Sequence, residues 1–157
     1  MIAPVFDLKD AAMPVFDFIF VTGSVDGAAT SAETDAGQVT TLSGDVNFAV
    51  DSDQLTDRAR EVLNDLAAQW NAKKPTKVTV VGHTDSVADD SHNLDLSKRR
   101  AKAVGDYLNS KVSGLSLTTD GKGESEPIAD ESEGSDEEKE KAKAANRRVE
   151  ITAEVPE

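Results

Sequence analysis

The amino-acid sequence predicts an α/β (α+β) two-layer sandwich, with strands and helices in the order β-α-β-α-β-α-β. Short strand-like segments recur between about residues 46 and 155, and amphipathic segments with helical spacing lie between them. Helix-capping and turn residues separate the two kinds of segment. A chain of 157 residues is long enough for one hydrophobic core, so a single sheet covered by helices is expected.

The first predicted strand and helix lie between residues 46 and 75. Val46, Phe48 and Val50 alternate with Asn47 and Ala49, which predicts a short strand with one apolar face. Thr56 is a candidate N-cap of the helix that follows. That helix carries apolar residues at three- and four-residue spacing, and Lys73-Lys74-Pro75 ends it: Ala59, Val62, Leu63, Leu66, Ala67 and Trp70.

The remaining elements follow in the same alternation. Residues 77–81 are almost continuously apolar, which predicts a strand covered on both faces. A helix is expected over 97–111 and a strand over 115–119. Ser135 begins a capping-box pattern and therefore a short exposed helix. Residues 148–155 alternate apolar and polar side chains and form the last predicted strand.

Two parts of the chain are distinguished by composition. Residues 1–40 are expected to form an N-terminal extension, with a strand over 15–21 and an acidic linker over 23–37, and residues 41–157 to form the main domain. The N-terminus lacks the basic region of a secretory signal. No segment has the ~18 uninterrupted apolar residues that span a bilayer, so membrane insertion by this chain is not expected.

The charge and the absence of cysteine exclude several function classes. Seventeen Lys and Arg against thirty Asp and Glu give a net charge of −13, which disfavours nucleic acid and anionic lipid surfaces as partners. Without cysteine the chain cannot form disulfides, use thiol catalysis or bind a metal through thiolates.

The strongest candidate for a binding site is the segment from Gly82 to Arg100. Gly82-His83-Thr84-Asp85 follows a buried strand, where ligands of α/β proteins usually bind, and Gly82 is expected to allow a sharp turn. Arg100 lies across a predicted loop from Asp85. Together they would bind a ligand with an ammonium and a carboxylate on adjacent atoms. The alternative, favoured on spacing alone, is that Asp85 and Arg100 pair with each other, or with solvent, and fix the loop.

Other chemistry is weakly represented. His83, Asp85 and His92 form an H-x-D…H set, but the nearby Lys98 and Arg100 oppose a cation, so no metal site is expected. The chain has no G-x-S-x-G motif, no Walker motif and no G-x-G-x-x-G motif. No cofactor and no catalytic residue are therefore predicted.

Four motifs together carry a family resemblance. They are G-H-T-D-S (82–86), N-x-x-L-S-x-x-R-A (93–101), G-x-G-E-x-x-P (121–127) and N-R-R-V-E-I (146–151). In this order and spacing they resemble the OmpA-like peptidoglycan-binding domain, the family that includes the C-terminal domain of OmpA, the peptidoglycan-associated lipoprotein and MotB. The resemblance covers about residues 46–155.

The resemblance implies a fold and a function. The fold would be a β-α-β-α-β-α-β sandwich whose last strand inserts antiparallel into a mixed sheet. The domain would not be an enzyme: it would bind the diaminopimelate of peptidoglycan stem peptides non-covalently and anchor the cell envelope to the wall. Its location would be the periplasm or the cell envelope, including the outer membrane. Asp85 and Arg100 would be the principal ligand-binding residues, with Thr84 and Asn93 in support and Asn146 and Arg147 bordering the cleft.

The chain departs from the family pattern at three places. Ala88 stands where glycine is common, His92 stands where an aromatic residue is usual, and residues 130–146 are longer and more highly charged than usual, enough to crowd or extend the rim of the cleft. Two alternatives stay open: a wall-associated hydrolase, and a scaffold module that keeps the fold without the ligand. The sequence does not predict an oligomeric state.

Overall fold

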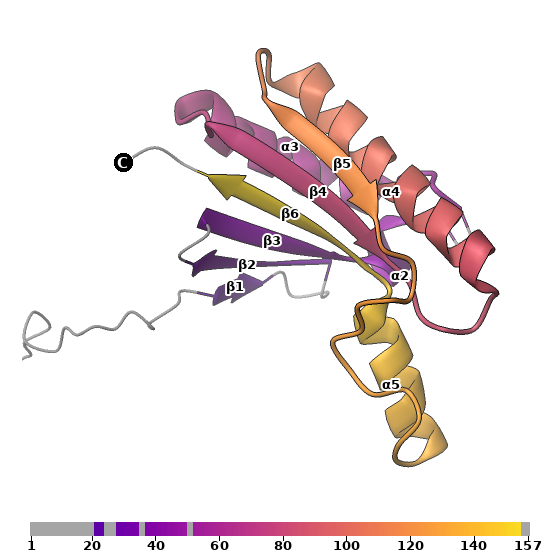
Figure 1. Ribbon diagram of the computed structural model, residues 1–157. Coiled ribbons are helices and arrows are strands. Elements are labelled where there is room, and N and C mark those ends of the chain that lie inside the picture. Colours follow the sequence, from indigo (N-terminus) through magenta and orange to yellow (C-terminus); the bar gives the residue numbers. More distant parts are fainter. Residues whose placement is uncertain (1–20, 24–27, 35–36, 50–51, 155–157) are drawn as a thin grey trace, which may run out of the picture.

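The computed structural model describes residues 21–23, 28–34, 37–49 and 52–154. A six-stranded mixed sheet forms one layer of the molecule (Figure 1). In spatial order its strands are β1 (Val21–Gly23), β2 (Ala29–Thr34), β3 (Gly37–Ser43), β6 (Arg148–Glu154), β4 (Lys77–His83) and β5 (Leu117–Gly121). β4 and β5 are parallel, and β6 lies antiparallel between β3 and β4. The mixed sheet and the antiparallel insertion of the last strand are thus confirmed.

Helices form the second layer. α3 (Asp57–Ala72) and α4 (Asp90–Lys111) contact each other, and α4 packs on β4 and β5. α5 (Asp136–Asn146) projects beyond the end of the sheet and leads directly into β6 (Figure 1). The two-layer α/β sandwich and the alternation from β3 through β6 agree with the sequence prediction.

One hydrophobic core lies between the layers. It buries the predicted inner faces of α3 and α4 against β3, β4 and β6. Burying each large side chain contributes roughly 1.5–3 kcal/mol. The largest apolar side chains that are fully buried, or nearly so, are Trp70, Leu42, Leu63, Leu108, Ile151, Val78, Val80, Val104, Val112 and Val149.

Side-chain caps determine where the helices begin. The Thr56 hydroxyl accepts a hydrogen bond from the amide of Ala59, and Ser135 forms the predicted capping box with Glu138. α4, however, begins at Asp90 and not at Ser97 as expected. The carboxylate of Asp89 accepts a 2.8 Å bond from the amide of His92 and caps the helix seven residues earlier.

The segment predicted as the first strand of the domain folds differently. Residues 44–47 form the short helix α2 (Gly44–Asn47), and the strand lies upstream as β3. The buried amide of Asn47 donates to the carbonyls of Ala28 and Ser43, both at 2.7 Å, and so holds the turn. Phe48 keeps only an isolated bridge to Leu55. The alternation of apolar residues over 46–50 therefore predicted the strand several residues after its actual position in β3.

The N-terminal part of the described chain joins the sheet. The boundary predicted between residues 40 and 41 falls inside β3, whose residues 38–43 pair with β6. Leu42 is fully buried in the core. We therefore propose that the folded unit begins upstream of residue 41. The strand predicted over 15–21 lies outside the described residues except for Val21, which is the first residue of β1.

Candidate functional site

A pocket of about 510 Å³ opens at the carboxyl end of β4. Its walls come from α2 and the residues after it, the β4–α4 loop, the first turns of α4, and the end of α5. The lining residues are Gly44, Asp45, Phe48, Ala49, Thr84, Asp85, Val87, Ala88, Asn93, Leu96, Arg100, Glu140, Lys143 and Arg147. Five of the six residues predicted to bind ligand are among them.

Gly82 lets α4 approach the strand that carries the site. It lies within β4, and a Cβ atom there would be 2.2 Å from the carbonyl oxygen of Ser97. Its carbonyl accepts from the amide of Lys122, and the amide of Thr84 donates to Gly123. The expected sharp turn at Gly82 is therefore wrong: the glycine is required by close helix–strand packing.

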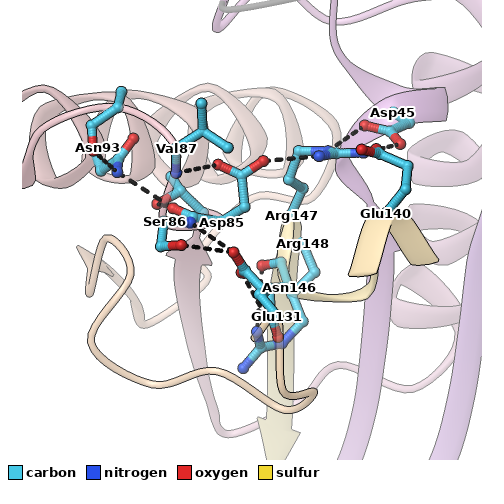
Figure 2. Close-up of polar contacts among 12 residues, drawn as sticks. Asp45, Asp85, Ser86, Val87, Asn93, Glu131, Glu140, Asn146, Arg147 and Arg148 are labelled. Carbon is cyan, nitrogen blue, oxygen red and sulfur yellow. Dashed lines mark hydrogen bonds and ion pairs between the residues drawn. The ribbon is translucent and has the colours of Figure 1, made fainter. Parts of the chain in front are cut away.

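Asp85 is held in the pocket by two donors. Its Oδ1 accepts from the amide of Val87 at 3.1 Å, and its Oδ2 accepts from Nη1 of Arg147 at 2.7 Å. Arg147 also donates to Asp45 at 2.8 and 2.9 Å and to Glu140 at 3.0 Å, so three carboxylates surround one guanidinium (Figure 2). The bonds to Asp45, and then those to Asp85 and Glu140, raise the pKa of Arg147 above its usual value, although burial opposes this. Arg147 is therefore a fixed positive charge.

Arg100 lines the same pocket. Only 6% of the residue is exposed. Its Nε donates to the Ser52 carbonyl at 2.7 Å and its Nη2 to the Ala49 carbonyl at 3.3 Å, and the guanidinium lies 4.8 Å from the centre of the Phe48 ring. The carboxylate of Asp85 pairs with Arg147 and not with Arg100. The alternative that Asp85 and Arg100 only pair with each other is therefore wrong, and both line one pocket.

Thr84 and Asn93 shape the loop between these charges. The Thr84 hydroxyl donates to the carbonyl of Asp85 at 2.8 Å. The buried amide of Asn93 donates to the Ala88 carbonyl and to a Glu124 carboxylate at 2.9 and 2.8 Å, with a longer contact of 3.2 Å to the Asp85 carbonyl (Figure 2 draws the contact to Asp85). Both residues line the pocket, although most of their polar side-chain atoms form hydrogen bonds that stabilise the loop.

Asn146 is the one predicted site residue that the structure does not bring to the pocket wall. Its side chain is fully buried. Its Oδ1 accepts from the amides of Ile128 and Ala129, and its Nδ2 donates to the Ala129 carbonyl and to Glu131. Glu131 in turn accepts from the amide and hydroxyl of Ser86 (Figure 2). Asn146 thus stabilises the loop of residues 128–131 beside the pocket.

Three charged lining residues were not predicted from the sequence. Asp45 was missed because its segment was expected to begin a strand and not the helix α2. Glu140 and Lys143 lie on α5, in the charged stretch 130–146 whose extra length was expected to crowd or extend the rim. That expectation was the only signal in the sequence, and it did not single out either residue.

His83 directly precedes Thr84 of the pocket, but its own side chain is buried. The residue is 3% exposed, and neither ring nitrogen has a hydrogen-bond partner. Burial, and then the positive charge of Arg148, lower the pKa of the imidazole. Among the described residues no group of three or more His, Cys, Asp or Glu side chains is arranged to hold a metal ion.

The described helices include none that is long and apolar enough to cross a membrane.

Comparison with known proteins identifies one family. The model of the OmpA family matches residues 47–141. Outer membrane porin F of Pseudomonas aeruginosa is 38% identical over 112 residues, and the peptidoglycan-binding protein ArfA of Mycobacterium bovis is 36% identical over 109 residues.

These matches cover most of this chain but little of the relatives. They include 70% and 69% of the chain, and 30% and 32% of the two relatives. Among solved structures, the cell wall anchor of the T6SS from Pseudomonas aeruginosa superposes with a TM-score of 0.64 at 28% identity, covering 89% of this chain and 90% of that one. The fold is thus shared with the T6SS cell wall anchor, and the segment matched by the family model contains most of the pocket-lining residues.

Proposed function

The chain belongs to the OmpA family, and on this premise we propose that it binds peptidoglycan non-covalently through the diaminopimelate of stem peptides. It would thereby anchor the cell envelope to the wall from the periplasmic side. The similarity to the peptidoglycan-binding protein ArfA and to the cell wall anchor of the T6SS supports wall binding. The observation that carries the ligand assignment is that Asp85 and Arg100 line one and the same pocket.

The chemistry of Asp85 and Arg100 fits an amino-acid head group. Arg100 offers a planar set of donors, held in place by two backbone carbonyls and the Phe48 ring. Asp85 offers carboxylate oxygens held by Val87 and Arg147. A ligand with an ammonium and a carboxylate on one carbon would bind both. Because the protein groups are already oriented, they lose little conformational entropy on binding.

The size of the pocket supports a small ligand. About 510 Å³ lies within the ~300–1,000 Å³ range of small-molecule sites. The free end of diaminopimelate is a compact zwitterion and needs only a part of this volume. The rest of the stem peptide and the glycan would lie outside, so the domain acts as a non-catalytic binding module on a large polymer.

Calorimetric titration tests this proposal. Diaminopimelate should bind the wild type, whereas lysine, which lacks the terminal carboxylate, should bind at least about tenfold more weakly because Arg100 then loses a charged hydrogen bond. Asp85→Asn and Arg100→Lys should each weaken diaminopimelate binding by a similar factor. The matched control is Arg99→Lys, since Arg99 is next to Arg100 but pairs with Asp95 on the exposed face of α4.

Thermal unfolding of each variant separates binding from folding. Equal affinities for diaminopimelate and lysine in all four proteins would reject the ligand assignment. If diaminopimelate produces no heat with a fully folded wild type, the scaffold interpretation is correct instead. Release of soluble wall fragments from peptidoglycan by the wild type would favour the hydrolase.

A further inference from the structure

Lys143 differs from the other charged residues of the pocket. It lies in the last turn of α5, is half-buried and lines the pocket wall. Within the described residues, its ammonium group has no hydrogen bond or ion pair. Its positive charge acts on Glu131, but the oxygens of Glu131 bond to Ser86 and Asn146 and not to Lys143.

The carboxylates that line the pocket already form hydrogen bonds with Arg147. Asp45, Asp85 and Glu140 all bond to Arg147, at 2.7–3.0 Å. None of the three pairs with Lys143. The three carboxylates balance the charges of Arg100, Lys143 and Arg147 in the pocket lining, so net charge does not select the ligand. What Lys143 lacks among the described residues is a hydrogen-bond acceptor, and an anionic group beside the amino-acid head group of a ligand would supply one.

We propose that Lys143 binds a second carboxylate of the ligand, one that lies outside the diaminopimelate head group. The inference rests on the proposed function, and it narrows the ligand to a stem peptide that keeps a free carboxylate beside its diaminopimelate. Asp85 and Arg100 take the zwitterionic end, and Lys143, on a different element, takes the additional anion at the rim. Amidation of that carboxylate would remove the partner of Lys143.

A purely structural role is the competing explanation. A lysine in the last turn of a helix interacts favourably with the helix dipole. That role predicts a lower melting temperature when the charge is removed and no change in ligand discrimination. The two explanations therefore differ in what a substitution does to affinity.

The test uses two peptides and two variants. One peptide contains alanine, γ-linked glutamate with a free α-carboxylate, and diaminopimelate; the other is identical except that the glutamate is amidated. Lys143→Met removes the ammonium and keeps an unbranched side chain. Lys141→Met is the matched control, because Lys141 is exposed on the same helix and does not line the pocket. Calorimetry gives the affinity of each protein for each peptide and for free diaminopimelate.

We expect the wild type and Lys141→Met to prefer the free carboxylate by about fivefold, and Lys143→Met to bind both peptides equally. Free diaminopimelate should bind all three proteins alike. A preference that survives in Lys143→Met, or is absent from the wild type, overturns the inference while the proposed function stands. If the wild type fails to bind diaminopimelate itself, the proposed function fails and this inference with it.

Discussion

Nη1 of Arg147 donates a 2.7 Å hydrogen bond to Oδ2 of Asp85, although the two residues are 62 positions apart. The bond joins the residue that precedes β6 to the loop after β4. It holds the Asp85 carboxylate in the pocket and leaves it with acceptor capacity for a ligand ammonium. The partner of Asp85 within the protein is thus Arg147, and Arg100 lines the same pocket.

Arg147→Met should lower the free energy of unfolding by about 1–2 kcal/mol. The substitution leaves Asp45, Asp85 and Glu140 close together without their shared cation. Urea denaturation measures the loss, and added salt should reduce it because salt screens the repulsion between carboxylates. Arg99→Met, which breaks an exposed pair with Asp95, should cost less than about 0.5 kcal/mol. Equal losses in the two variants would show that Arg147 is an ordinary surface residue.

Asn146→Ala should cost about 2–4 kcal/mol, since it leaves the amides of Ile128 and Ala129 and one oxygen of Glu131 without their buried partner. Chemical denaturation gives the total, and hydrogen exchange of the Ile128 and Ala129 amides reports the local effect. Asn71→Ala is the control, because Asn71 is exposed and makes one 3.3 Å contact. Unchanged exchange at Ile128 and Ala129 would contradict the role assigned to Asn146.

Gly82→Ala should destabilise the domain far more than Gly105→Ala. At Gly82 the new Cβ would meet backbone atoms of Ser97 at 2.2 Å, which cannot move without shifting α4. At Gly105 it would meet the ends of Thr119 and Leu117 side chains at 2.7 and 2.8 Å, which can rotate, and alanine also favours the helix. We expect at least about 3 kcal/mol at Gly82 and about 1 kcal/mol or less at Gly105. Similar melting temperatures would refute the packing explanation.

The stability of the domain should fall as the pH drops below about 6.5, the ordinary pKa of histidine. His83 is buried, and Arg148 and Lys122 oppose its protonation while Glu150 and Glu126 favour it, with a net lowering of the folded-state pKa. Between the folded and unfolded pKa values the unfolded chain binds more protons, so the free energy of unfolding rises with pH in that window.

Melting temperatures of the wild type and His83→Asn, measured from pH 7.5 to 5.0, test this dependence. The difference between the two curves isolates His83 from the carboxylates that also titrate on acidification. It should change in the direction that favours the variant at low pH. Parallel curves would mean that His83 does not contribute.

Elements with long, regular patterns were predicted well. The apolar stripe of α3, the continuous run of β4 and the alternation of β6 each extend over several residues, so their burial follows from local periodicity. Short strands and polar first turns of helices were predicted less well. β3 was placed too far along the chain because alternation over five residues also fits the turn around Asn47. α4 was predicted seven residues short because a polar first turn, capped by Asp89, has no apolar stripe.

The sequence by itself determined the order of the elements from α3 to β6, the family motifs, and the two residues on opposite sides of a β4–α4 loop. These depend on neighbours in the chain. Which charges meet was decided by the tertiary structure: Arg147 with Asp45, Asp85 and Glu140, and Lys143 with none of them. These residues come from α2, a loop, α5 and the start of β6, and only the packing of those elements brings their side chains within hydrogen-bonding distance or keeps them apart.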